Sequence, residues 1–170
     1  MARAESSIRQ GIRISIDRMT EHDLLEVVEI EESSGLSPWG WDAYHSELHA
    51  GETRIMLVAR LGRGKAEPAD SKRIAGYIVA RPVADELHIS NVAVRHEYRR
   101  RGIGSALLNE ALRQGGRMGS MQALLEVRAG NLAAQRLYWR CGFRVAGRRR
   151  DYYSAPQEDA LIMTAAIKRR

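Results

Sequence analysis

A single carboxylate interrupts an apolar stretch of the chain. Residues 121–127, MQALLEV, have the composition of a strand, and Glu126 stands where a core-facing position would carry valine or isoleucine. Burial raises the pKa of a carboxyl group and can make it a general base. The alternative is an ion pair between Glu126 and Arg128 or another arginine. Glu126 is therefore a candidate proton acceptor that also has a structural interpretation.

A glycine-containing junction follows a predicted strand and opens a predicted helix. In RRRGIGSALL, residues 99–108, Gly102 and Gly104 would let the backbone approach a ligand closely. Helix N-termini present unpaired N–H groups and a partial positive charge, so they bind anions such as a pyrophosphate. The spacing fits neither the dinucleotide fingerprint nor a nucleoside-triphosphate loop, and a tight turn beside a solvated basic patch is the alternative. The candidate contacts are Arg99, Arg100, Arg101, Gly102, Ile103, Gly104 and Ser105.

A third group of candidates lies in GNLAAQRLYWRCGF, residues 130–143. Asn131 is expected to cap a helix, and Tyr138 follows about two turns later. Both have a structural alternative, the asparagine as a cap alone and the tyrosine as a core residue. Cys141 could act as a nucleophile, but before Gly-Phe at a helix end it is more simply a small buried hydrophobe.

Hydrophobic periodicity predicts the elements that must position these side chains. Strand-like and helical runs follow one another in the order β-α-α-β-β-β-α-β-α-β-β. This order predicts an α/β protein, in which a mixed sheet carries helices on both faces. We expect a flexible extension at 1–11 and a single domain at 12–167. The predicted strands are 12–17, 54–60, 73–80, 86–94, 121–127, a strand from Phe143 and 160–167; helices are predicted after a cap at Thr20, from a cap at Asp42 to about Ala50, from Ile103 and at 132–140, with an exposed loop at 61–72.

Composition and charge narrow the class of protein. The chain has 170 residues, of which 44% are hydrophobic and 28% charged, as is typical of one folded domain. No segment approaches the ~20 apolar residues of a membrane-spanning helix, and no secretory signal is recognisable, so we expect a cytoplasmic protein with no membrane partner. The lone cysteine excludes an internal disulfide and the usual cysteine-based zinc site, and no metal is expected.

At this point the sequence resembles the GNAT superfamily of acetyl-CoA-dependent N-acetyltransferases. Arg99, Gly102 and Gly104 stand at the places of the family's Q/R-x-x-G-x-G segment, which wraps the CoA pyrophosphate. The resemblance implies that Val92, Ala93 and Val94 bind the pantetheine arm and the acetyl group through their backbone, and that Asn131 contacts CoA. It also implies a mixed, mostly antiparallel sheet of about seven strands with a parallel, splayed pair.

Within the superfamily, the segments LEVRAGNLAAQRLYWRCGF, RRRDYY, EDALIM and PW resemble the bacterial ribosomal-protein alanine N-acetyltransferases of the RimI type. This resemblance implies acetylation of the N-terminal α-amine of a ribosomal protein. It gives Glu126 the role of proton acceptor and Tyr138 that of proton donor. Trp39, Tyr152 and Tyr153 are the candidate acceptor contacts, the two tyrosines in a loop between the last strands. We expect a monomer or a weak dimer.

The chemistry of acetyl transfer needs a neutral amine, a polarised thioester and a proton for the leaving thiolate. A peptide α-amine has a pKa of about 7.7–8.0, so a modest base such as Glu126 suffices near neutral pH. Unpaired backbone N–H groups of Val92 to Val94 could stabilise the oxyanion. A phenol with a pKa of about 10 stays protonated and could protonate the leaving sulfur, which favours direct transfer in a ternary complex over a covalent route through Cys141.

Two other classes of function remain open at the level of the sequence. One is a GNAT enzyme that acetylates a small amine or a protein lysine. The other is a non-catalytic nucleic-acid-binding module, because the net charge of +6 is concentrated in arginine clusters at 95–101, 148–150 and 168–170. We expect no direct nucleic-acid role, and we expect structural or solvent-facing places for His88 and for Glu29, Glu31 and Glu32.

Overall fold

The computed structural model describes residues 4–7, 13–35, 38–51, 53–62 and 74–168. Its elements follow the order that the periodicity predicts, with one additional strand at the start. They are β1 (Ala4–Ser7), β2 (Arg13–Arg18), the 3-10 helix η1 (Glu21–Asp23), α1 (Leu24–Ser33), α2 (Gly40–His49), β3 (Ile55–Leu61), β4 (Ile74–Val83), β5 (Glu86–Val94), the 3-10 helix η2 (His96–Tyr98), α3 (Ile103–Arg117), β6 (Gln122–Arg128), α4 (Leu132–Arg140), β7 (Arg144–Ser154) and β8 (Gln157–Ala166).

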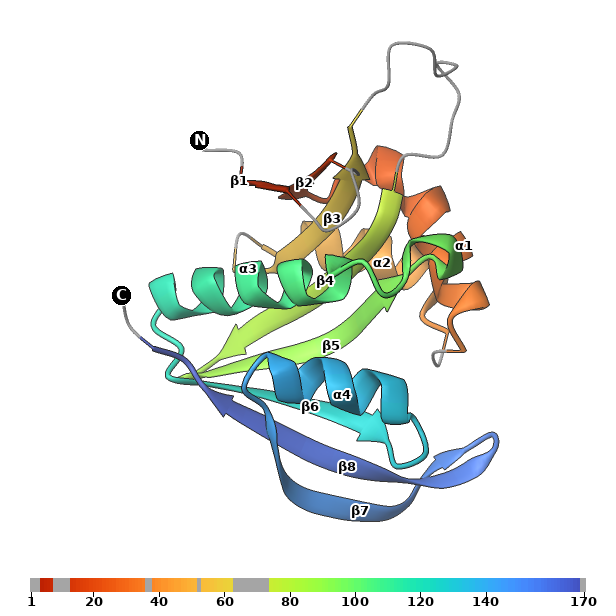
Figure 1. Ribbon diagram of the computed structural model, residues 1–170, viewed down its shortest axis with the longest axis vertical. Coiled ribbons are helices and arrows are strands. Elements are labelled where there is room, and N and C mark those ends of the chain that lie inside the picture. The colour runs from red at the N-terminus through yellow and green to blue at the C-terminus, as the bar shows by residue number, and fades with distance from the viewer. Residues whose placement is uncertain (1–3, 8–12, 36–37, 52, 63–73, 169–170) are drawn as a thin grey trace.

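The strands form one twisted sheet in the order β1-β2-β3-β4-β5-β6-β8-β7. All neighbouring pairs among the described strands are antiparallel except β5 and β6, which are parallel. Helices α3 and α4 lie on one face and α1 and α2 on the other (Figure 1). The predicted mixed sheet of about seven strands is confirmed by β2–β8, and β1 adds a short strand to its edge.

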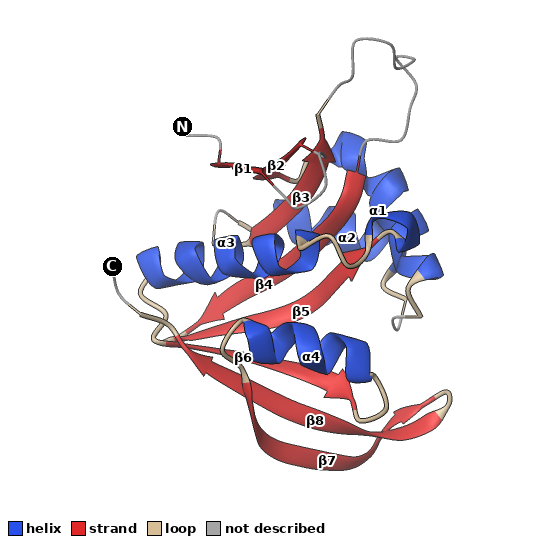
Figure 2. Ribbon diagram, in the orientation of Figure 1, coloured by secondary structure: helices blue, strands red, loops and turns tan. Residues whose placement is uncertain are grey.

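Two hydrophobic cores hold the three layers together (Figure 2). Ile103, Leu107 and Ala111 recur every four residues on α3, and all three are buried against the sheet. On the opposite face, Leu24 and Val27 of α1 are fully buried. Burying one such aliphatic side chain contributes roughly 1.5–3 kcal/mol. The two cores therefore hold the sheet between its helices. The backbone edges of the strands remain available for a functional site.

The parallel pair separates halfway along its length. Strands β5 and β6 are paired only from Glu86 opposite Gln122 to Ile89 opposite Leu125. Beyond this point a register shift against β4 leaves Ser90 as an extra residue in β5, which is the geometry of a β-bulge. The bulge bends the end of β5 away from β6, and the expected splay is present.

The ends of several elements differ from the prediction. The helix α2 begins at Gly40, and Asp42 is not its cap, because the distant carboxylate of Glu31 accepts the N–H groups of Trp39 and Gly40 at 2.9 and 3.0 Å. The last two strands are longer than expected and form a hairpin, so Tyr152 and Tyr153 both lie in β7 and not in a loop.

The two terminal and loop expectations fall partly outside the described residues. Residues 4–7 of the expected N-terminal extension form β1, which pairs with β2, and the rest of 1–11 is not described. Most of the expected 61–72 loop likewise lies in the undescribed range 63–73. Among the helices that the structure describes, we find none long and apolar enough to cross a membrane.

Candidate active site

The free edge of β5 faces the gap between the splayed strands. The N–H of Arg95 donates to Ala75 of β4 at 2.8 Å, and strand geometry alternates the direction of successive N–H groups. Val94 and Val92 therefore present their N–H and carbonyl groups to the gap, whereas Ala93 is turned toward β4. Of the three predicted backbone contacts, two lie on the open edge.

Glu126 is the first residue of β6 beyond the last pair with β5. Its neighbours Leu125 and Val127 are buried in the core beneath α3 and α4, so strand alternation turns Glu126 to the opposite face. Its side chain is 23% exposed and pairs with Arg149 on β7, with 2.8 Å between Oε1 and Nη1. The side chain is therefore only partly buried, and the ion pair considered as the alternative is present, with Arg149 as the partner.

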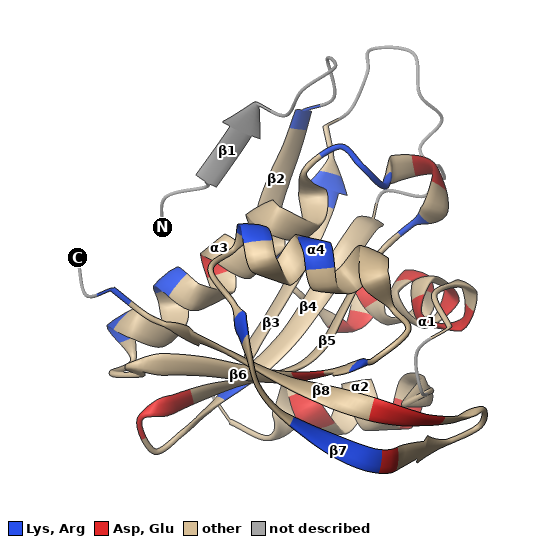
Figure 3. Cartoon of the chain, turned by 60° about the horizontal axis from the view of Figure 1, so that its bottom comes forward, with Lys and Arg blue, Asp and Glu red and all other residues tan. Residues whose placement is uncertain are grey.

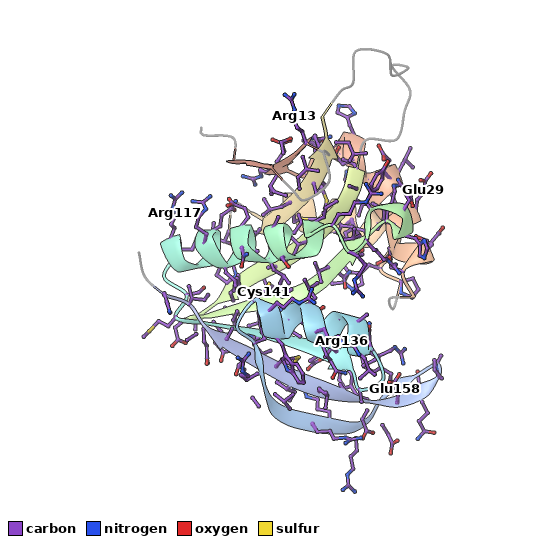
Figure 4. The ribbon with its side chains drawn as sticks, viewed as in Figure 1. Arg13, Glu29, Arg117, Arg136, Cys141 and Glu158 are labelled. Atoms are coloured by element: carbon purple, nitrogen blue, oxygen red, sulfur yellow. The ribbon has the colours of Figure 1, made fainter. Side chains whose placement is uncertain are left out.

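Arg128 has a different role from the one considered in the sequence. Its Nη1 lies 3.2 Å from Oε2 of Glu158 on β8, and its guanidinium stacks 4.1 Å above the ring of Tyr153. Oε1 of Glu158 accepts the N–H of Gly130 at 2.5 Å. These contacts hold the turn after β6 against the β7–β8 hairpin, near the position labelled Glu158 in Figure 4.

Tyr138 approaches the sheet from the other side. It lies on α4, is 7% exposed and packs against Phe143 with 5.9 Å between ring centroids. Burial raises the pKa of Tyr138 above its ordinary value, and the neighbouring Tyr153 and Cys141 add to the shift. The phenol is therefore neutral at physiological pH and available as a proton donor.

Tyr152 and Tyr153 border the carboxylate. The hydroxyl of Tyr152 is hydrogen-bonded to Glu126, and this bond is the main reason that the pKa of Tyr152 is raised. Burial raises the pKa of Tyr153, and the charge of Glu126 contributes. The two rings meet edge to face at 5.1 Å between centroids. Tyr152 and Tyr153, which are predicted to contact the acetylated peptide, thus lie beside Glu126, the predicted proton acceptor.

The predicted anion site lies at the start of α3. Gly102 is the N-cap with φ +85°, a conformation that favours glycine, and the first helical bond runs from Ala106 to Gly102. The N–H groups of the first turn therefore lack helical partners. The Nε of Arg99 donates to the Val94 carbonyl at 2.9 Å and ties this loop to β5. The side chain of Arg99 thus links the loop before α3 to the free edge of β5.

Gly104 has a packing role that the sequence did not suggest. A Cβ at this position would lie 3.0 Å from Cδ2 of Leu137 on α4. The absence of a side chain therefore lets α3 and α4 approach each other, and Gly104 is buried beneath them. The expected contact of the Gly104 backbone with a ligand stays a prediction.

Asn131 caps α4 as predicted, because its side chain accepts the N–H of Ala134 at 3.1 Å. A buried residue of the same helix, Gln135, donates to the carbonyl groups of Arg128 and Ala129 at 3.2 and 2.8 Å. Cys141 is half-buried between α3 and α4 (Figure 4) and is hydrogen-bonded to Ser105, and burial raises the pKa of its thiol. A protonated thiol is a poor nucleophile, which weighs against a covalent route.

A buried polar network that sequence reasoning missed lies under α1 and α2. Glu31 is 1% exposed, and its Oε1 accepts the Tyr44 hydroxyl at 2.6 Å. The Tyr44 oxygen lies 2.7 Å from the Tyr77 oxygen and accepts an N–H of Asn91 at 2.9 Å. The expectation of a solvent-facing Glu31 was wrong, and the signal was available, since Glu31 continues the apolar stripe of Leu24 and Val27 along one helix face.

Trp39 lies at the edge of this network. Its backbone N–H donates to Glu31, the residue is 36% exposed, and its ring is tilted against that of Tyr44 at 5.5 Å between centroids. The network therefore holds Trp39 at a fixed position on the α1–α2 face, the face to which Glu126 is turned. His88, considered as an alternative base, pairs with Glu86 at 2.8 Å near the paired end of β5.

A mixed sheet whose parallel pair splays beside a glycine-led helix N-terminus is the architecture of the GNAT acetyltransferases. Residues 24–143 match the acetyltransferase (GNAT) family, and the chain belongs to it. The expected enzyme class is confirmed.

Similar proteins narrow the class further. The ribosomal protein bS18-alanine N-acetyltransferase of Escherichia coli (strain K12) is 33% identical over 155 residues, or 90% of this chain and 97% of the relative. The crystal structure of the ribosomal-protein-S18-alanine N-acetyltransferase from Escherichia coli has a TM-score of 0.75 at 31% identity, covering 91% of this chain and 94% of that one. Arabidopsis thaliana NAA60 in complex with acetyl-CoA shares the fold, with a TM-score of 0.77 at 22% identity over 91% and 98% of the chains. The resemblance to the RimI type is confirmed.

Proposed function

We propose that this protein transfers the acetyl group of acetyl-CoA to the N-terminal α-amine, preferably of alanine, of a ribosomal protein. The observation that carries the proposal is the position of Glu126 at the opening of the β5–β6 gap, on the face opposite Tyr138. A donor that passes through this gap would have a proton acceptor on one side and a proton donor on the other. The similarity to bS18-alanine N-acetyltransferases over nine-tenths of the chain supports this choice of acceptor.

The chain offers a suitable cradle for acetyl-CoA. The unpaired N–H groups at the start of α3, with Arg99, Arg100 and Arg101 before them, fit a pyrophosphate. The backbone of Val92 and Val94 would bind the pantetheine arm, and Asn131 at the start of α4 would contact CoA. When bound, acetyl-CoA supplies an activated thioester.

The chain's own groups account for the proton transfers. The carboxylate of Glu126 accepts a proton from the ammonium form of the acceptor directly or through water. The N–H groups of Val92 and Val94 stabilise the oxyanion of the tetrahedral intermediate. Tyr138 donates its proton to the leaving thiolate, and the proton that the attacking nitrogen loses as the amide forms restores the phenol, directly or through water. No covalent intermediate on Cys141 is involved.

Several observations weigh against a nucleic-acid-binding module. Arg149 pairs with Glu126, and Arg148 pairs with Asp159 at 2.5 Å, so two members of the cluster on β7 are engaged within the protein. Arg95 is buried, and its Nη2 lies 3.1 Å from Glu26. The basic stretch on β7 in Figure 3 is therefore partly neutralised by its own neighbours. The proposed reaction would take place in the cytoplasm and needs only one copy of the chain.

The test is acetylation of a peptide that begins Ala-Arg, followed by mass spectrometry of the modified position. We expect modification of the free α-amine and none of the same peptide with a blocked N-terminus. Glu126→Gln should lower kcat by about 10²–10⁴-fold, the usual contribution of a general base. The matched control is Glu86→Gln, a β5 glutamate at the paired end of the strand, which should retain wild-type activity.

Three outcomes would contradict parts of the proposal. Equal modification of the blocked peptide would assign the acceptor to lysine. Binding of acetyl-CoA without transfer would indicate a small amine as the acceptor. Full activity of the Glu126→Gln variant would remove Glu126 from the mechanism.

A further inference from the structure

A cluster of potential metal ligands lies on the surface where η1 meets the end of α2. Glu21 comes from η1, and His45 and His49 come from α2. One ligand atom from each residue lies within 4.8 Å of the others. The Glu21 Oε1 is 3.5 Å from Nε2 of His45 and 2.9 Å from Nε2 of His49. The cluster thus joins two elements and lies outside the site described above.

The two histidines are arranged as ligands by their own helix. Residues four apart lie on the same face of an α-helix, and the rings of His45 and His49 are 4.5 Å apart. His45 is also stacked on Trp41 at 4.6 Å with an interplanar angle of 18°, which restricts its rotation. The helix therefore presents both imidazoles toward the same carboxylate.

A backbone contact selects the state in which His49 can bind a metal. Its Nδ1 lies 2.8 Å from the carbonyl oxygen of His45, so this nitrogen carries the hydrogen and donates it. Such an Nδ1–H bond to a carbonyl is the usual support of a metal-binding histidine. In neutral His49 the Nε2 lone pair then faces the Glu21 oxygen at 2.9 Å. A positive charge between the two atoms, either a proton on Nε2 or a metal ion, would hold them at this distance.

The spacing suits a tetrahedral zinc ion. Zinc binds nitrogen and carboxylate oxygen at about 2.0–2.2 Å, so two donors on one tetrahedral ion lie about 3.4 Å apart. The distances from Glu21 Oε1 to Nε2 of His45 and of His49, 3.5 and 2.9 Å, bracket this value. Imidazole ligands favour zinc and similar transition metals over magnesium and calcium, which prefer oxygen. Water would fill the fourth position.

We propose that Glu21, His45 and His49 bind a divalent transition-metal ion of the zinc class, which joins η1 to α2. The ion takes no part in acetyl transfer. It would hold together the pair of helices α1 and α2, and Trp39 lies at the start of α2. The site differs from the sequence-based expectation of no metal, because its third ligand becomes adjacent only in the folded chain. Glu21 is well placed beforehand, since Thr20 and Asp23 form a capping box around η1.

The test is isothermal titration calorimetry, in which zinc chloride is added to the untagged, EDTA-treated protein. We expect one zinc per chain, and at least a tenfold loss of affinity in His49→Ala and in Glu21→Gln. The control is His88→Ala, because His88 also pairs with a glutamate at 2.8 Å but lacks a second histidine. A hundredfold excess of free zinc over Kd should raise the Tm of the wild type by roughly 5–10 °C, and the same concentration of magnesium should not.

Two results would overturn the proposal. The first is the absence of saturable zinc binding by the wild type, which would leave the cluster as an ordinary histidine–glutamate ion pair. The second is wild-type affinity in both His49→Ala and Glu21→Gln, which would place any bound zinc elsewhere. Because these two residues are exposed and lie on different elements, circular dichroism can show that each variant is folded before it is titrated.

Discussion

At the scale of single residues, the proposed chemistry rests on two groups with different surroundings. Glu126 is partly exposed and lies between Arg149 and Tyr152, both on β7. Tyr138 is buried, and its pKa is raised above the ordinary value. The carboxylate is accessible to an acceptor amine, whereas the phenol is shielded from water and keeps its proton. The two groups can therefore serve opposite steps of one reaction.

Removal of the Tyr138 hydroxyl should slow the reaction without unfolding the protein. Tyr138→Phe keeps the ring that packs on Phe143, so we expect the free energy of unfolding to change by less than about 1 kcal/mol. We expect kcat to fall by about 10²-fold, the lower range for a general acid. Steady-state kinetics with a thiol-detecting reagent measures this, and an unchanged kcat would exclude Tyr138 as the proton donor.

The same residue determines the alkaline side of the pH profile. Because the pKa of Tyr138 is raised, its proton-donating form persists to pH values above about 10. The rate should rise through the pKa of the acceptor amine, about 7.7–8.0, and then stay level to about pH 10. A fall in kcat between pH 8 and 9 would show that a group other than Tyr138, or a Tyr138 without a raised pKa, controls the step.

At the scale of elements, the site depends on how closely β4 and β5 approach before β5 bends away. A Cβ on Gly76 of β4 would lie 2.6 Å from the carbonyl oxygen of Ala93 and 3.2 Å from Cα of Val94. Both atoms belong to the backbone, which cannot rotate aside as a side chain can. Gly76 is therefore required for the path of the β5 segment that faces the gap.

Gly76→Ala should destabilise the fold and disturb donor binding together. Overpacking of this kind costs about 1–3 kcal/mol, and displacement of Val94 should raise the KM for acetyl-CoA. The matched control is Gly147→Ala on β7, where the nearest atom to a new Cβ is Ile162 Cδ1 at an ordinary 3.5 Å. Urea denaturation and steady-state kinetics measure the two effects. Equal stability of the two variants would contradict this account.

At the scale of the whole molecule, the Glu31 network connects the helices of one face to the middle of the sheet. Glu31 on α1 binds Tyr44 of α2, which contacts Tyr77 of β4 and Asn91 of β5. Burial raises the pKa of Tyr44 and of Tyr77, so both hydroxyls remain protonated and able to donate. The network thereby fixes α1 and α2, the helices on the side where the acceptor peptide is expected, to β4 and β5.

Glu31→Ala should lower the free energy of unfolding far more than Glu32→Ala at the neighbouring position. Loss of the carboxylate leaves the N–H groups of Trp39 and Gly40 and the Tyr44 hydroxyl without their acceptor, and we expect a loss of about 3–5 kcal/mol of folding free energy. Glu32→Ala, at an exposed neighbouring position, should change it by less than about 0.5 kcal/mol. Denaturant unfolding compares the two variants, and similar values would refute the proposed role of the network.

Features that depend on neighbours along the chain could be predicted from the amino-acid sequence. The span of α4 and its cap at Asn131 follow from helical periodicity and a single side-chain acceptor. The start of α3 at the glycine junction, the order of the elements and the family follow from similarly local signals. Such features are predictable because the residues that cause them lie within a turn or two of one another.

The contacts between residues far apart in the chain became visible in the folded structure. It paired Glu126 with Arg149 in place of Arg128, buried Glu31 beneath α2, and set Glu126 and Tyr138 on opposite faces of the sheet. It also joined Glu21 to the two histidines of α2. The physical reason is that strand register, bulges and helix packing are settled by contacts between segments far apart in the chain, and these contacts leave no periodic signal in either segment alone.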